Sequence, residues 1–182
     1  MTAVTALSGC LDGLGSSDED EQRGTGDEDA PPFEVQTVDA PGSDAGTVAV
    51  PTDGQVQLIN HIRLECPTSR AMLSRVDEAV ERLEDDYTVG PDGDVLALSV
   101  IDATIDSDPT PSELADWWAE HGGDWTIGID EVGSLFDHHD VTGTPTTVAV
   151  DGDGEIHWRD EGGTTARNLV SGVESALEAE RT

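Results

Sequence analysis

The segment from Val56 to Ser69 constrains the fold more than any other part of the sequence, because a strand-like run leads directly into the start of a helix. Val56 to Ile62 is mostly apolar, which is typical of a central strand covered on both faces. Pro67 suits the first turn of a helix, and apolar residues then recur at intervals of three and four. We therefore expect a buried strand, a short loop containing Cys66, and a helix from about Pro67 to Leu83.

The rest of the sequence continues to alternate between strands and helices. A β-hairpin is expected over 33–50, strands over 95–101 and 125–129, a helix capped by Ser112, a helix opened by Asp130, a strand pair within 143–158 joined by a turn at 151–154, and a last helix from 164 to about 178. Parallel strands that alternate with helices, followed by an antiparallel pair and a closing helix, predict an α/β fold. Its mixed central sheet is flanked by helices and preceded by an N-terminal β-hairpin.

The charge balance is strongly acidic. The chain has 40 acidic residues against 8 basic ones, all arginine, and a formal net charge of −32. Such a surface repels nucleic acids and anionic lipid headgroups, so we expect no nucleic-acid partner. The composition resembles that of proteins from extremely halophilic archaea, in which concentrated salt screens the self-repulsion; the Debye length falls to about 3 Å at 1 M.

The N-terminus predicts a lipid anchor. Leu7-Ser8-Gly9-Cys10 resembles the lipobox of secreted lipoproteins, in which the cysteine becomes the lipidated first residue. We expect a truncated signal over 1–10, a flexible acidic tether over 11–32, and one domain over 33–182 on the outer face of the cell membrane. The alternatives are a chance Ser-Gly-Cys and a Cys10–Cys66 disulfide. No run approaches the roughly 18–20 apolar residues of a membrane-spanning helix, so Cys10 is the only membrane attachment expected.

Two motifs resemble membrane-anchored thioredoxin-like proteins of the TlpA and ResA type. Leu58 to Ser69 resembles their strand and active-site cysteine, and Thr142 to Thr147 resembles their segment with a cis-proline beside the sulfur. The resemblance implies a thioredoxin-like fold, thiol-disulfide redox activity without a cofactor or metal, a thiol- or disulfide-bearing protein partner, and a monomer. The residues that it implies for the catalytic site are Cys66, Ser69 and Pro145, with Glu65, Pro67 and Thr144 lining the substrate groove.

The sequence departs from this family at the two positions that matter most for the chemistry. Ser69 stands where the family has its second cysteine, and Glu65 where it has a tryptophan. In a Cys-x-x-Cys pair, the second thiol attacks a mixed disulfide and releases the substrate, which Ser69 cannot do. The helix start should lower the pKa of the Cys66 thiol, whereas Glu65 should raise it. We therefore expect single-cysteine chemistry in which an outside thiol resolves the mixed disulfide.

Three other functions stay open at this point. The domain is alternatively a non-catalytic binding module that uses the groove beside Pro145. Cys66 with His61 or His138 would also suit copper or zinc. Cys66-Pro67-Thr68 resembles the peroxiredoxin motif, although Ile59 and Arg63 stand where peroxiredoxins carry proline and threonine. The paired His138 and His139 are interpreted as a helix terminus rather than a ligand set.

Overall fold

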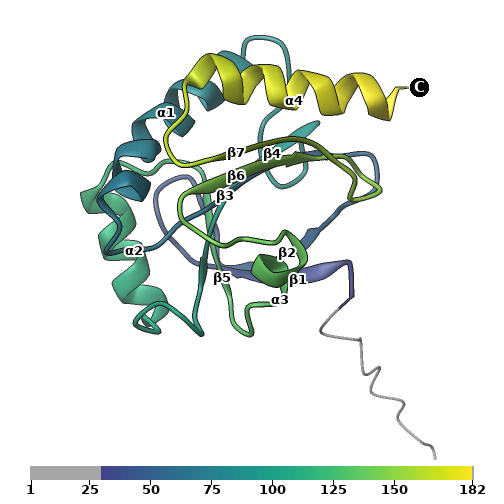
Figure 1. Cartoon of the computed structure of the whole chain (residues 1–182). Coiled ribbons are helices and arrows are strands. Elements are labelled where there is room, and N and C mark those ends of the chain that lie inside the picture. Colours follow the sequence, from purple (N-terminus) through teal and green to yellow (C-terminus); the bar gives the residue numbers. More distant parts are fainter. Residues whose placement is uncertain (1–29, 182) are drawn as a thin grey trace, which may run out of the picture.

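The computed structural model describes residues 30–181, which form a central sheet with helices packed on it (Figure 1). The elements in chain order are β1 (Phe33–Thr37), β2 (Gly46–Val50), β3 (Val56–His61), α1 (Pro67–Leu83), β4 (Val95–Asp102), α2 (Pro111–Glu120), β5 (Thr126–Asp130), α3 (Ser134–His138), β6 (Thr146–Val150), β7 (Ile156–Glu161) and α4 (Ala166–Glu180). The expectations about Cys10, the lipobox and most of the tether lie outside the described residues. None of the helices within 30–181 is long and apolar enough to cross a membrane.

The seven strands form one mixed sheet in the order β2-β1-β5-β4-β3-β6-β7. Strands β3, β4 and β5 are parallel, whereas β1, β6 and β7 run antiparallel to their neighbours. The expected hairpin of β1 and β2 is present and adds two strands beside β5. Strand β3 lies between β4 and β6, so the loop that leaves its C-terminal end is held from both sides.

Alternate residues of the central strands enter two separate cores. Leu58 packs in the core that also contains residues of α1, α2 and α4, whereas Ile59 packs in the core that contains residues of α3. Every residue of β3 is buried. Sliding β3 by one residue would turn each of its side chains to the opposite face of the sheet and so into the wrong core. Because burial of each large aliphatic side chain stabilises the fold by roughly 1.5–3 kcal/mol, this slip is strongly disfavoured. This register fixes where the following cysteine lies.

The structure confirms the extent of α1, from Pro67 to Leu83, and corrects the start of α2. The N-cap of α2 is Thr110 and not Ser112. The Thr110 side chain accepts the N–H of Glu113, and the Glu113 carboxylate accepts the N–H of Thr110. Pro111 occupies the first turn. This reciprocal capping satisfies two N–H groups at once, which Ser112, inside the first turn, cannot do.

The prediction that Asp130 opens a helix is wrong. Asp130 is the last residue of β5 and pairs with Asp102 of β4. Its carboxylate accepts the backbone N–H groups of Gly133, Leu135 and Phe136, so it organises the turn into α3 from outside that helix. Pairing with β4 therefore extends the strand by one residue beyond the expected range.

Candidate functional site

Cys66 lies at the N-cap of α1, half-buried, where β3 and its following loop deliver it. Its sulfur accepts the backbone N–H of Ser69 at 3.4 Å. The thiol donates in turn to the backbone carbonyl of Thr144, also at 3.4 Å. The expected strand, cysteine and helix arrangement therefore places a thiol at a helix start, beside the loop that precedes β6.

The pKa of the Cys66 thiol is lowered. Burial of the sulfur acts to raise this pKa, but hydrogen bonds from the side chain and backbone of Ser69 and from the backbone of Thr68 outweigh it. These donors stabilise the thiolate over the thiol. Glu65 was expected to oppose ionisation, but it is exposed, where water screens its charge.

Ser69 is completely buried, with 0% of its surface exposed, behind Cys66. Its Oγ accepts the backbone N–H of Arg63 at 3.3 Å. The hydroxyl thus connects the first turn of α1 to the loop that leaves β3, in addition to lowering the pKa of the thiol. Ser69 stabilises the site, but it has no sulfur with which to attack a disulfide formed at Cys66.

The segment before β6 forms the other wall of the site. The Thr144–Pro145 peptide is cis, and the carbonyl of Pro145 accepts the N–H of Gly162 at 2.7 Å. Antiparallel pairing of β3 with β6 places Thr146 opposite His61. This register brings Thr144 to Cys66 across 78 residues of sequence. The structure therefore brings together Cys66, Ser69 and the segment of Thr144 and Pro145, while Pro67 is exposed at the rim.

Two histidines that sequence reasoning did not connect form a buried pair behind the site. Nε2 of His61 lies 3.1 Å from Nδ1 of His139, and Nδ1 of His61 lies 3.2 Å from the carbonyl of Thr146. Burial lowers the pKa of His61 well below its usual value, and burial with the nearby His138 lowers the pKa of His139 to about 4. Both rings are therefore neutral at pH 7.

This pairing bears directly on the metal alternative. Both nitrogens of His61 are already engaged, so His61 has no free nitrogen for a metal at Cys66. The ring of His138 packs on Phe33, with centroids 4.9 Å apart. Within residues 30–181, the one group of three potential ligands close enough to share an ion is Asp151, Glu155 and His157, in the β6–β7 hairpin. The interpretation of His138 and His139 as a helix terminus holds for position, but it missed the contact of His139 with His61.

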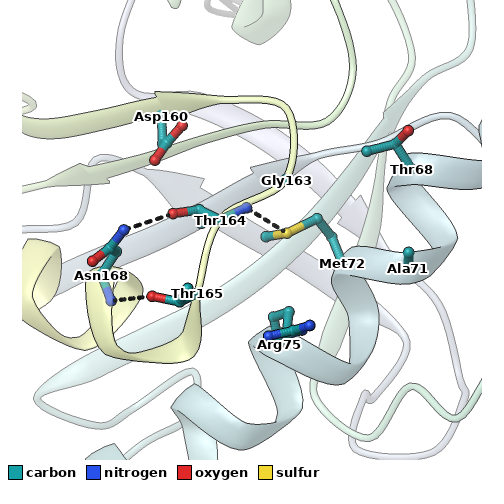
Figure 2. Close-up of a pocket in the computed structure, with 9 residues that line it drawn as sticks. All are labelled: Thr68, Ala71, Met72, Arg75, Asp160, Gly163, Thr164, Thr165 and Asn168. Atoms are coloured by element: carbon teal, nitrogen blue, oxygen red, sulfur yellow. Dashed lines mark hydrogen bonds between the residues drawn. The ribbon is translucent and has the colours of Figure 1, made fainter.

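A groove of about 440 Å³ opens beside the site, between α1 and the start of α4 (Figure 2). It is lined by Thr68, Ala71, Met72, Arg75, Asp160, Gly163, Thr164, Thr165 and Asn168. Sequence reasoning missed it because its walls come from segments some 90 residues apart. The available signal was the Gly162-Gly163-Thr164-Thr165 run, where glycines and hydroxyl residues precede a helix.

Comparisons with known proteins identify the fold. The sequence matches no protein-family model and no curated protein. Solved structures do match. StoA from Bacillus subtilis is 18% identical, with a TM-score of 0.62, and the match covers 77% of this chain and 94% of that one. The exposed lipoprotein thioredoxin Etrx1 from Streptococcus pneumoniae is 17% identical, with a TM-score of 0.61 and coverage of 78% and 97%.

A thiol:disulfide interchange protein of the thioredoxin family from Chlorobium tepidum is 13% identical, with a TM-score of 0.56. The match covers 81% of this chain and 98% of that protein. Each comparison extends over nearly the whole of the similar structure. The mixed seven-stranded sheet and its flanking helices agree with them. The chain therefore has the thioredoxin-like fold that its sequence predicts.

Proposed function

We propose that this protein carries out thiol-disulfide exchange through one reactive cysteine, Cys66. The observation that carries the proposal is the thiol of lowered pKa at the start of α1, held between the Ser69 N–H and the Thr144 carbonyl. Proteins of the same fold described as thioredoxins and thiol:disulfide interchange proteins support it. The partner is a protein that carries a disulfide or a reactive thiol.

The reaction has two exchanges. The Cys66 thiolate attacks one sulfur of the partner's disulfide, which forms a Cys66–partner disulfide and expels the other partner sulfur as a thiolate that takes a proton from water. Because Ser69 cannot attack this mixed disulfide, a thiolate from outside the protein attacks the partner's sulfur and releases the Cys66 thiolate. In each exchange two electrons pass from one sulfur atom to another, so the reaction needs no cofactor.

The proposal includes a place for the reaction. The domain acts on the outer face of the cell membrane, anchored through lipid on Cys10, as a monomer in concentrated salt. The lipobox-like Leu7 to Cys10 and the composition support this placement. The pneumococcal protein of the same fold is described as an exposed lipoprotein.

Mass spectrometry tests the proposed exchange directly. A Cys10→Ser chain, in which Cys66 is the single thiol, is incubated in molar KCl with a peptide disulfide. We expect one mixed disulfide at Cys66, which added glutathione discharges, and none in a Cys10→Ser/Cys66→Ser control. An unmodified Cys66 would contradict the proposal and favour the non-catalytic binding module.

Restoring the missing sulfur gives a second test. A Ser69→Cys chain should reduce insulin disulfides with dithiothreitol as the electron donor, because the second thiol would displace the partner from Cys66. Turbidity from the released insulin chains measures the rate. Ser69→Ala is the matched control and should stay at the background rate. A Ser69→Cys chain that folds, as circular dichroism shows, yet gains no activity would argue that Cys66 does not engage protein disulfides.

A further inference from the structure

The groove between α1 and α4 begins next to a residue that contacts the reactive thiol. Thr68 lines the groove, and its backbone hydrogen-bonds to the Cys66 sulfur. On the opposite wall, Gly163 follows Gly162, whose N–H binds the carbonyl of Pro145. A Cβ at Gly163 would lie at an ordinary van der Waals distance of 4.0 Å from Cγ2 of Thr68, so Gly163 and Thr68 face each other at this end of the groove. The Thr68 end of the groove is therefore the end that lies nearest to Cys66.

The groove extends well away from the sulfur. A second hollow, of about 390 Å³, shares Arg75, Thr165 and Asn168 with the first and continues along α1 to Arg82. At a helical rise of about 1.5 Å per residue, Arg75 lies about 10 Å along α1 from Thr68. Three or four extended residues span that distance, at about 3.3–3.6 Å each. The dimensions fit a short segment of a partner's chain.

Arginines are concentrated in this groove. Arg75, Arg82 and Arg167 line it, which is three of the eight basic residues in a chain of net charge −32. Two acidic residues also line it, and of these Glu78 is paired with Arg82. The side chains of Arg75 and Arg167 make no hydrogen bond or ion pair within residues 30–181. Their guanidinium groups are thus available, and guanidinium binds carboxylates through paired hydrogen bonds.

We propose that this groove binds an acidic segment of the partner protein, located within about four residues of the partner's reactive cysteine. The inference rests on the proposed function and adds a preference for one class of partner. In molar salt the screening length is about 3 Å, so the general acidity of the surface no longer repels such a segment, whereas direct contact with Arg75 and Arg167 persists.

Matched peptides test the proposal in the full Cys10→Ser chain in molar KCl. Each carries one cysteine activated as a mixed disulfide with thiopyridine, and Asp-Glu-Asp-Glu or Asn-Gln-Asn-Gln on one side of it. Each peptide is made in two versions, one with the four-residue segment before the cysteine and one with it after the cysteine. Cys66 attacks the peptide sulfur and releases thiopyridone, whose absorbance gives the rate. We expect the acidic peptide of one order to react about fivefold faster than its amide counterpart, the size of one or two exposed ion pairs.

Four arginine variants locate the effect. Arg75→Gln and Arg167→Gln should each reduce the preference for the acidic peptide, and the double variant should abolish it. Arg181→Gln, which removes the same charge at the far end of α4, should retain it. Rates are divided by each variant's rate with neutral 2,2′-dipyridyl disulfide, so that a change in the thiol itself does not enter the comparison.

The outcomes separate the two proposals. If Cys66 does not react even with dipyridyl disulfide, the proposed function fails. If it does react but acidic and amide peptides are equal, or if Arg181→Gln removes the preference as fully as Arg75→Gln, the groove proposal alone is overturned. A rate that rises equally for both peptides on Arg75→Gln would show that the chain's own acidic tract, residues 18–29, occupies the groove, and would also overturn it.

Discussion

At the scale of single residues, burial and hydrogen bonds to neighbouring residues set the pKa of the Cys66 thiol. The sulfur of Cys66 receives hydrogen bonds from the first turn of α1, and these outweigh the effect of its burial on the pKa. The two motifs predicted the helix start at Cys66 and the cis-proline segment of Thr144 and Pro145 before β6, because short sequence patterns fix both features. They did not predict the dual role of Ser69, which depends on where the N–H of Arg63 points.

Removing the Ser69 hydroxyl tests this control. In Ser69→Ala, the thiolate loses one hydrogen bond and the Arg63 N–H loses its acceptor, so the pKa of Cys66 should rise. The rate of alkylation by iodoacetamide, measured against pH in molar KCl, should shift to higher pH and fall several-fold at pH 7. An unshifted profile would mean that the backbone donors alone set the pKa. Ser74→Ala, in the exposed second turn of α1, is the matched control.

At the scale of elements, hydrophobic periodicity predicted the bounds of an element correctly where that element carries its own pattern. It failed where a contact with another element decides the bounds. The apolar spacing of α1 predicted its extent because the helix buries one continuous face. Asp130 looks like a helix cap, but β4 holds it in the sheet, and no local pattern reports that pairing. The same reasoning explains His61 and His139, which are separated by 78 residues and are brought together only by the tertiary fold.

The contact between α4 and β7 gives a prediction at this scale. Gly172 packs on Trp158, and a Cβ there would lie 2.6 Å from Cδ2 of the indole. At an open helical position, replacing glycine with alanine normally stabilises the helix by about 0.5–1 kcal/mol. Here the new methyl group would instead push the rigid indole ring out of place. We expect Gly172→Ala to lower the free energy of unfolding by about 1–3 kcal/mol, as urea denaturation in molar KCl measures it. The neighbouring exposed Ser171→Ala should leave stability within about 0.5 kcal/mol, and equal values for both variants would contradict the packing.

At the scale of the whole molecule, charge and topology act together. The order of the seven strands was not readable from the sequence, because parallel connections leave several arrangements open. The class of fold was readable, since buried strands alternate with amphipathic helices. The net charge of −32 opposes the compact fold through self-repulsion, which salt screens.

Salt should therefore stabilise the protein strongly. We expect the urea midpoint to rise steadily from about 0.1 M to 2 M KCl, because the Debye length falls from about 10 Å to below 3 Å. Circular dichroism at fixed pH measures it. A midpoint that does not depend on KCl would show that the acidic residues are spaced widely enough not to destabilise the fold.

The buried histidine pair makes stability depend on pH. The folded protein keeps His61 and His139 neutral, whereas the unfolded chain protonates them with a pKa near 6.5. The contribution of the two histidines to the free energy of unfolding is therefore fully present above about pH 6.5. It is lost as the pH falls towards about 4, the pKa of His139 in the folded protein. Unfolding free energies in molar KCl should decline from pH 7.5 to 5. The slope should be shallower in a His61→Gln/His139→Asn chain, and equal slopes would contradict the assignment.

The complete burial of Ser69 has a consequence for how the protein would store oxidising or reducing power. A pair of neighbouring sulfurs closes into an internal disulfide, whose reduction potential is a property of the molecule. With an oxygen sealed in the second position, residues 30–181 hold no such couple. Under the proposed exchange, the oxidised fraction of Cys66 follows the concentrations of the thiols and disulfides around it. Such a protein keeps no electron pair in reserve between encounters and reflects the redox balance of its surroundings at each moment.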